Sequence, residues 1–151
     1  TLETAAGPFT LTCIADRIDR DPAEGFVIID YKTGRTPSQK QVESGFSPQL
    51  PLEAAVLRAG GFDKLAAGEV TGLAYWKMSG GREAGKVTSL DGVQQLTEDA
   101  AAGLARRVVF FSDPQTPYAP RVKPMFESDL GDYDHLARVR AWSAAGGEDG
   151  E

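Results

Sequence analysis

Two aspartates and a lysine are the residues of this sequence whose types and spacing could support chemistry. Asp16 lies seven residues before Ala23, and Asp30 lies seven residues after it. Ala23 belongs to a turn that joins two apolar stretches. If the stretches pair as antiparallel strands about that turn, Asp16 lies opposite Asp30, with Cβ atoms about 5 Å apart. Lys32 shares the face of Asp30, because side chains alternate along a strand. The spacing therefore predicts two carboxylates and an ammonium group side by side, which a register slip of one residue would separate.

Two carboxylates opposed on an apolar sheet repel each other and lose hydration. A divalent cation between them removes both penalties, and Mg²⁺ prefers a few carboxylates together with water and phosphate oxygens. Such an ion can activate water and neutralise charge on a phosphate during in-line displacement, and Lys32 could orient that water or stabilise the transition state. The alternative from spacing alone is structural, since aspartates near turns and lysines at strand ends are common surface residues.

Two strands and a helix must position these groups. The apolar pattern predicts strands at residues 9–20 and 26–31, joined by a turn that contains Pro22 and Gly25. A helix is predicted over about 48–59, where apolar side chains recur at helical spacing before two glycines.

The remaining predicted elements complete an α/β or α+β fold around a small mixed sheet. In chain order they are strands at 70–78 and 86–90, a helix at about 93–112, a proline-containing loop at 114–124 and a helix at 133–142. Residues 146–151 form an acidic tail that we expect to be disordered. We therefore predict one domain over residues 1–145.

Composition excludes several classes of protein. At 151 residues and 41% hydrophobic content, the chain suits one globular domain. It contains neither a stretch of about 20 apolar residues that could span a membrane nor the pattern of a signal peptide. We expect a cytoplasmic domain that is part of a larger protein, because the chain opens on Thr1. The net charge of −6 opposes tight binding of nucleic acid, so another part would have to hold any DNA on which the domain acts.

Three motifs, in this order, carry a resemblance to a known family. They are ADRID at 15–19, IIDYKTG at 28–34 and PQLPLEA at 48–54, and the run YDHLARV at 133–139 extends the match over nearly the whole chain. The sequence resembles the RecB-like nucleases of the PD-(D/E)XK superfamily, most closely the C-terminal nuclease domain of the AddB-type subunit of helicase-nucleases that act in double-strand break repair. This resemblance implies an α/β fold with a restriction-endonuclease-like core, in which helices flank a small mixed sheet.

The same resemblance implies an activity and its residues. The activity is that of a Mg²⁺-dependent deoxyribonuclease, an exonuclease in which Mn²⁺ can substitute, with DNA and an AddA-type subunit as partners and DNA repair and recombination as its role. The family's two metal ligands fall on Asp16 and Asp30, and its catalytic lysine falls on Lys32. Its Gln-x-x-x-Tyr motif is matched by Gln49, which we expect to be a catalytic positioning group, but Glu53 stands where the tyrosine is expected.

Other residues depart from the family pattern or carry weaker predictions. Relatives have an acid or a histidine on a helix before the first strand, for which Glu3 is the candidate here. Some AddB-type proteins hold an iron–sulfur cluster, which Cys13 alone cannot do, and we expect this cysteine to be a small buried hydrophobic residue. His135 is expected to be structural or exposed. Isolated basic residues that could contact phosphate are Arg17, Arg35 and Lys40.

Two other functions stay open at this point. The chain could be a nuclease-fold module that no longer cuts and that docks or guides DNA, although Asp16, Asp30 and Lys32 argue against this. A stand-alone exonuclease of the type used in CRISPR adaptation would call for a cysteine cluster and a basic surface, and the sequence has neither.

Overall fold

The computed structural model describes residues 1–21, 25–80 and 85–117. The chain divides into two compact units, Thr1–Asp113 and Pro114–Glu151. All helices and strands described below belong to the first unit. The predicted helix at 133–142 and the predicted acidic tail lie outside the described residues.

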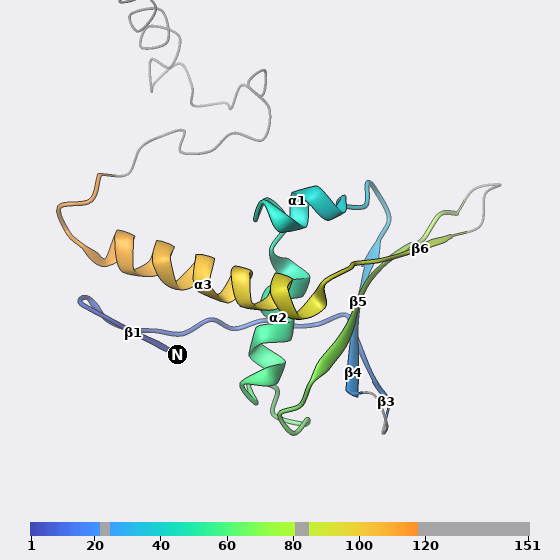
Figure 1. The fold of residues 1–151 in the computed structure, drawn as a ribbon, viewed down its shortest axis with the longest axis horizontal. Helices are drawn as coiled ribbons and strands as arrows, with labels where there is room; N and C mark the ends of the chain where they lie inside the picture. Colours follow the sequence, from blue (N-terminus) through green and yellow to red (C-terminus); the bar gives the residue numbers. More distant parts are fainter. Residues whose placement is uncertain (22–24, 81–84, 118–151) are drawn as a thin grey trace, which may run out of the picture. The chain divides into compact units, whose positions relative to one another are not determined.

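A four-stranded mixed sheet is the centre of the first unit (Figure 1). Its strands, in spatial order, are β3 (Arg17–Asp21), β4 (Gly25–Lys32), β5 (Val70–Lys77) and β6 (Lys86–Ser89). The β3–β4 and β5–β6 pairs are antiparallel, whereas β4 and β5 are parallel. Parallel strands need a long connection, and here the connection contains two helices.

Three helices accompany the sheet, namely α1 (Gln39–Glu43), α2 (Gln49–Arg58) and α3 (Val93–Ser112). Figure 1 shows the sheet at the right, with α2 and α3 beside it. The core lies between them, where side chains of alternate positions on β4 and β5 meet apolar side chains of α2 and α3. Members of this core include Ile28, Leu50, Leu57, Leu73 and Leu96. The expected α/β architecture, a small mixed sheet flanked by helices, is therefore present.

The first strand differs from the prediction. Instead of one strand over residues 9–20, the structure has β2 (Gly7–Phe9) and β3, with residues 10–16 in neither. β2 pairs with β1 (Leu2–Thr4) in a separate two-stranded sheet. The β-branched residues of this stretch favour an extended chain, but only Arg17–Arg20 of it pair with β4, which itself continues past the last pair to Lys32. Strand propensity alone therefore did not fix where the strand begins.

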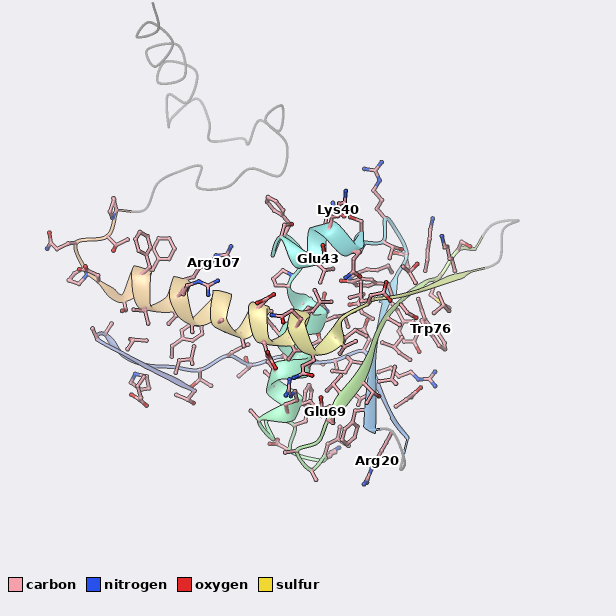
Figure 2. All side chains as sticks on the ribbon, in the orientation of Figure 1. Arg20, Lys40, Glu43, Glu69, Trp76 and Arg107 are labelled. Atoms are coloured by element: carbon pink, nitrogen blue, oxygen red, sulfur yellow. The ribbon has the colours of Figure 1, made fainter. Side chains whose placement is uncertain are left out.

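α1 was not predicted, because a helix of five residues is too short to show an apolar period. Its start is nevertheless encoded locally: Ser38 and Gln41 form a capping box, in which each side chain bonds the backbone of the other residue. Gln39 ties the helix to the β6–α3 connection, since its amide group both donates to the carbonyl oxygen and accepts from the amide of Asp91, each at 3.1 Å. Figure 2 shows Lys40 and Glu43 on this helix.

The start of β4 depends on a glycine. Gly25 has φ +115°, a conformation that L side chains rarely adopt, and a Cβ there would lie 2.6 Å from the carbonyl oxygen of Glu69. This oxygen accepts a hydrogen bond from the amide of Phe26 at 2.8 Å. Gly25 thus allows β4 to approach the start of β5. Within the described residues, no helix is both long and apolar enough to cross a membrane.

Candidate active site

Asp16 and Asp30 lie where the antiparallel β3–β4 pair ends. The register pairs Arg17 with Ile29 and Ile18 with Ile28, as the turn around Ala23 predicted. The paired residues end with Arg17 and Ile29, the chain neighbours of Asp16 and Asp30. Asp16 lies just before β3, so it is not on the strand as expected, and its carboxylate accepts a hydrogen bond of 2.9 Å from the amide of Tyr31. This bond ties the exposed Asp16 side chain to the edge of β4.

Asp30 is buried and pairs with Lys32. Only 2% of Asp30 is exposed, and the Lys32 ammonium nitrogen lies 2.7 Å from Asp30 Oδ2. The contact is an ion pair without hydrogen-bond geometry, so within the described residues Oδ2 has no hydrogen-bond donor. A buried carboxylate oxygen without a donor is costly unless a positive charge compensates it. The Lys32 side chain supplies one such charge and is itself 29% exposed, so it reaches from the buried aspartate toward the surface.

Gln49 links Lys32 to Glu53. As predicted, Gln49 lies at the start of α2 and reaches the hairpin, since its Oε1 accepts a hydrogen bond of 3.3 Å from Lys32. Its Nε2 donates to Glu53 Oε1 at 3.1 Å, one helical turn away. Lysine only donates and a carboxylate only accepts, so these two partners together fix the orientation of the Gln49 amide. The ammonium group of Lys32 is thus held between Asp30 and Gln49.

Glu53 is the second buried acid of this region, with 3% of the residue exposed. Its Oε2 has no hydrogen-bond partner among the described residues. Burial raises the pKa of Glu53, the charges of Asp30 and Asp16 raise it further, and the hydrogen bond from Gln49 and the charge of Lys32 act in the opposite direction. The negative charges of Asp30 and Asp16 therefore act on Glu53 near the end of β4.

Tyr75 is a residue that the sequence analysis missed. It pairs with Asp30 in the parallel β4–β5 register, and its buried hydroxyl group has no hydrogen-bond partner within the described residues. Burial and the negative charges of Asp30 and Glu53 raise the pKa of Tyr75 to about 12. Its strand was predicted, but pairing between strands so far apart in the sequence leaves no local signal, so the neighbourhood of Tyr75 could not be foreseen.

The residues at this site fit a divalent metal ion. Glu53 Oε2 is a buried carboxylate oxygen without a hydrogen-bond partner in the described part of the chain, and a cation would compensate such an oxygen. In residues 1–21, 25–80 and 85–117, however, no three His, Cys, Asp or Glu side chains are grouped closely enough to hold a metal ion together. An ion held by Asp16 and Asp30 would therefore take its other ligands from water and phosphate, as Mg²⁺ commonly does.

The other candidates lie apart from this cluster. Arg17 makes two hydrogen bonds to Asp19, at 2.7 and 2.8 Å, and its guanidinium group lies 5.1 Å from the centroid of the Trp76 ring. It occupies the sheet face opposite Asp30, because neighbouring positions of a strand alternate. Figure 2 labels Trp76 at this side of the sheet. The charge of Arg17 is thus already balanced by a carboxylate, which weakens its candidacy as a phosphate contact.

The weaker candidates have varied positions. Glu3 is exposed on β1 and pairs with Pro8, while Arg35 and Lys40 are exposed after β4 and on α1. Cys13 is half-buried rather than buried, and burial and the charge of Glu53 raise its pKa. His135 lies outside the described residues.

Comparison with known proteins gives one family. A family model described as the PD-(D/E)XK nuclease superfamily matches residues 1–123. A protein of Rickettsia conorii that carries the name uncharacterized protein is 47% identical over 51 residues, which are 34% of this chain and 6% of that protein. An uncharacterized protein of Rickettsia felis is 40% identical over 62 residues, or 41% of this chain and 7% of that protein. The chain therefore matches only a small part of the length of these relatives, and no solved structure matches it.

Proposed function

Because the chain belongs to the PD-(D/E)XK nuclease superfamily, we propose that it hydrolyses phosphodiester bonds of DNA with the help of Mg²⁺, which Mn²⁺ can replace. The observation that carries this proposal is the arrangement around Asp30, a buried carboxylate that is ion-paired with Lys32, whose ammonium group also donates to Gln49. The superfamily has a restriction-endonuclease-like core, and the mixed sheet with flanking helices agrees with it.

Asp16 and Asp30 would hold the metal ion. When bound, such an ion lowers the pKa of a water molecule and withdraws charge from the phosphate. The chain itself holds these two ligands in place. The amide of Tyr31 donates a hydrogen bond to the Asp16 carboxylate, and Asp30 belongs to strand β4. Their carboxylates also offset the positive charge of the ion and of Lys32, so that the site does not hold an excess of positive charge before DNA binds.

Lys32 provides a fixed positive charge next to the scissile phosphate. Its ammonium group donates to Gln49 and contacts Asp30, so it is held in place before DNA binds. A charge that needs no reorganisation stabilises the negative charge that develops in the transition state. Gln49 contributes by positioning Lys32, and Glu53 contributes by orienting the Gln49 amide.

We also propose in which larger protein and in which process the domain acts. The domain would be the nuclease part of an AddB-type helicase-nuclease, acting as an exonuclease in double-strand break repair and recombination in the cytoplasm with an AddA-type partner subunit. Two facts support a role inside a larger assembly: the relatives are far longer than the matched segment, and the chain has a net charge of −6, so strong DNA binding would come from other parts. Motor motifs in the rest of the parent reading frame would test this context.

A cleavage assay tests the nuclease activity. The chain is incubated with end-labelled single- and double-stranded DNA in millimolar Mg²⁺ or Mn²⁺, and products are resolved on a denaturing gel. We expect Asp30→Asn and Lys32→Ala each to lower the rate by roughly 100-fold or more, because the first removes a ligand of the ion and the second removes the positive charge beside the reacting phosphate. Asp63→Asn, a change at an exposed loop position, is the matched control and should leave the rate unchanged.

Two results would contradict the proposal. Cleavage that persists in the Asp30→Asn variant, or in the presence of a chelator, would place the activity elsewhere. DNA binding without cleavage in either metal would favour the alternative that the chain is an inactive nuclease-fold module that docks or guides DNA.

A further inference from the structure

Three lysines occupy neighbouring positions at one end of the sheet. In the β4–β5 register Lys32 pairs with Lys77, and in the β5–β6 register Lys77 pairs with Lys86. Paired residues on neighbouring strands point to the same face, so the three side chains form a row across three strands. We call Lys32, Lys77 and Lys86 the lysine row.

The lysine row lies on the face that carries the candidate active site. Lys32 is two residues beyond Asp30 on β4, and Lys77 is two residues beyond Tyr75 on β5, so the alternation of side chains puts them all on one face. The Lys32 ammonium nitrogen lies 5.9 Å from the centroid of the Tyr75 ring, which agrees with this arrangement. The row thus begins at the site and runs across β5 to β6, away from β3.

Such a row is unfavourable for the protein by itself. Strands lie about 4.8 Å apart, and like charges directly opposite on neighbouring strands destabilise a sheet. Lys32 has Asp30 as a partner, but among the described residues no acidic side chain forms an ion pair with Lys77 or Lys86, both of which are exposed. Figure 1 shows β6 and the end of β5 extending to the right, away from α2 and α3.

Protection of a sheet edge explains only part of the row. Lysine on an edge strand prevents pairing with another chain, and this suffices for Lys86, since β6 is the last strand of the sheet in the part of the chain that the structure describes. Lys77, however, lies on β5, which has β4 and β6 on its two sides. A lysine on an inner strand, between two others, has no edge to protect. A polyanion that lies across the three strands would compensate all three charges at once.

We infer that the lysine row is a contact track for the phosphates of a DNA strand, which it leads from the Asp30 site across β5 to β6. This inference rests on the proposed function and names the path of the substrate. The track would orient the strand at the site by local contacts, although the chain as a whole is acidic. Phosphate contacts of this kind set the position of DNA without reading its sequence.

Binding of a fluorescent single-stranded oligonucleotide tests the track, measured by anisotropy in EDTA so that no cleavage occurs. The test variant is Lys77→Gln with Lys86→Gln, which leaves Lys32 and the active site intact. The matched control is Lys64→Gln with Arg107→Gln, which removes the same number of charges at exposed positions outside the row. A second variant, Lys77→Arg with Lys86→Arg, keeps the charges.

The Gln variant should bind at least tenfold more weakly than the control. The slope of log K against log salt should also be smaller by about 1.4, or roughly 0.7 for each lost phosphate contact. The Arg variant should bind like the parent chain. Equal binding by the Gln variant and the control would overturn the inference, and so would an absence of any binding by the parent. If the parent binds through the row but does not cleave in Mg²⁺ or Mn²⁺, the track stands and the proposed nuclease activity fails.

Discussion

The amide of Gln49 shows how single residues define the candidate site. Its oxygen accepts a hydrogen bond from the ammonium group of Lys32, which can only donate. Its nitrogen donates a hydrogen bond to the carboxylate of Glu53. In this chain the glutamine is thus oriented by a negatively charged acceptor, Glu53. The other oxygen of Glu53 is buried without a hydrogen-bond partner among the described residues, which is electrostatically unfavourable.

The first residue-scale prediction concerns metal binding. A cation that binds only the folded chain stabilises it by RT ln(1 + [L]/Kd), or about 1.4 kcal/mol when the metal is at about ten times Kd. For a domain of this size that is a melting shift of a few degrees. Asp30→Asn should abolish most of the shift, because it removes one ligand. Thermal melting with and without Mn²⁺ measures this, with Asp63→Asn as the control. Equal shifts in Asp30→Asn and the control would mean that the ion binds elsewhere.

The second residue-scale prediction concerns pH and Glu53. Burial raises the pKa of Glu53 above its ordinary value of 4.5, so the folded state binds this proton more tightly than the unfolded state does. The free energy of unfolding should therefore fall as the pH rises from 4.5 through the raised pKa. Glu53→Gln has no carboxyl group here and therefore lacks this pH dependence. The free energy of unfolding of the variant, relative to that of the parent, should increase with pH over the same range.

Urea unfolding of both proteins in EDTA, at a series of pH values, measures this difference. Parallel curves for Glu53→Gln and the parent would show that burial does not perturb Glu53. Adding Mn²⁺ should reduce the difference, because a cation stabilises the ionised carboxylate.

At the scale of elements, three arrangements bring the site together. The antiparallel β3–β4 pair ends next to Asp16 and Asp30, the parallel β4–β5 pair brings Tyr75 beside Asp30, and the packing of α2 on the sheet places Gln49 near Lys32. The buried apolar residues of α2, including Leu50 and Leu57, hold this helix against the sheet. The chemistry of the site thus depends on the core that lies beneath it.

Gly25 gives the element-scale prediction. Gly25→Ala should destabilise the chain by more than about 1 kcal/mol, because φ is positive and the new Cβ would lie 2.6 Å from a backbone oxygen. Gly103→Ala is the matched control on α3, where φ is ordinary and the nearest atom is a flexible arginine nitrogen at 3.8 Å. This control should stabilise by roughly 0.5–1 kcal/mol, because glycine is a poor residue within a helix. Urea unfolding measures the change in stability of each variant. A change of the same sign in both would contradict the role that we assign to Gly25.

At the scale of the whole molecule, charge and function have to be reconciled. The chain carries a net charge of −6, yet it belongs to a nuclease superfamily whose substrates are polyanions. Electrostatic repulsion over the whole chain limits its own affinity for DNA. In our proposal, a larger assembly holds the DNA, while the lysine row and the metal ion act over the few ångströms of the site.

The sequence by itself determined the family, the order of the main elements and the hairpin register. The β3–β4 register followed from a short turn, because a tight connection leaves few ways to align two strands. The helices α2 and α3 were foreseen within about one residue, since the apolar period and the glycine or proline stops are local signals. Asp16, Asp30 and Lys32 were predicted as site residues from the hairpin spacing and from motifs, and Gln49 from a motif alone; their roles stay predictions.

Only the tertiary structure decided which residues surround those motifs. The parallel pairing of β4 with β5 joins segments some forty residues apart, as in the pair of Asp30 with Tyr75, and it aligns Lys32 with Lys77. A parallel register is set by the helices that pack across both strands and by the core between them, and no turn in the sequence specifies it. The start of β3 was likewise decided in three dimensions: β4 continues to Lys32, but beyond the last pair the Tyr31 amide donates to the Asp16 side chain and not to a backbone oxygen.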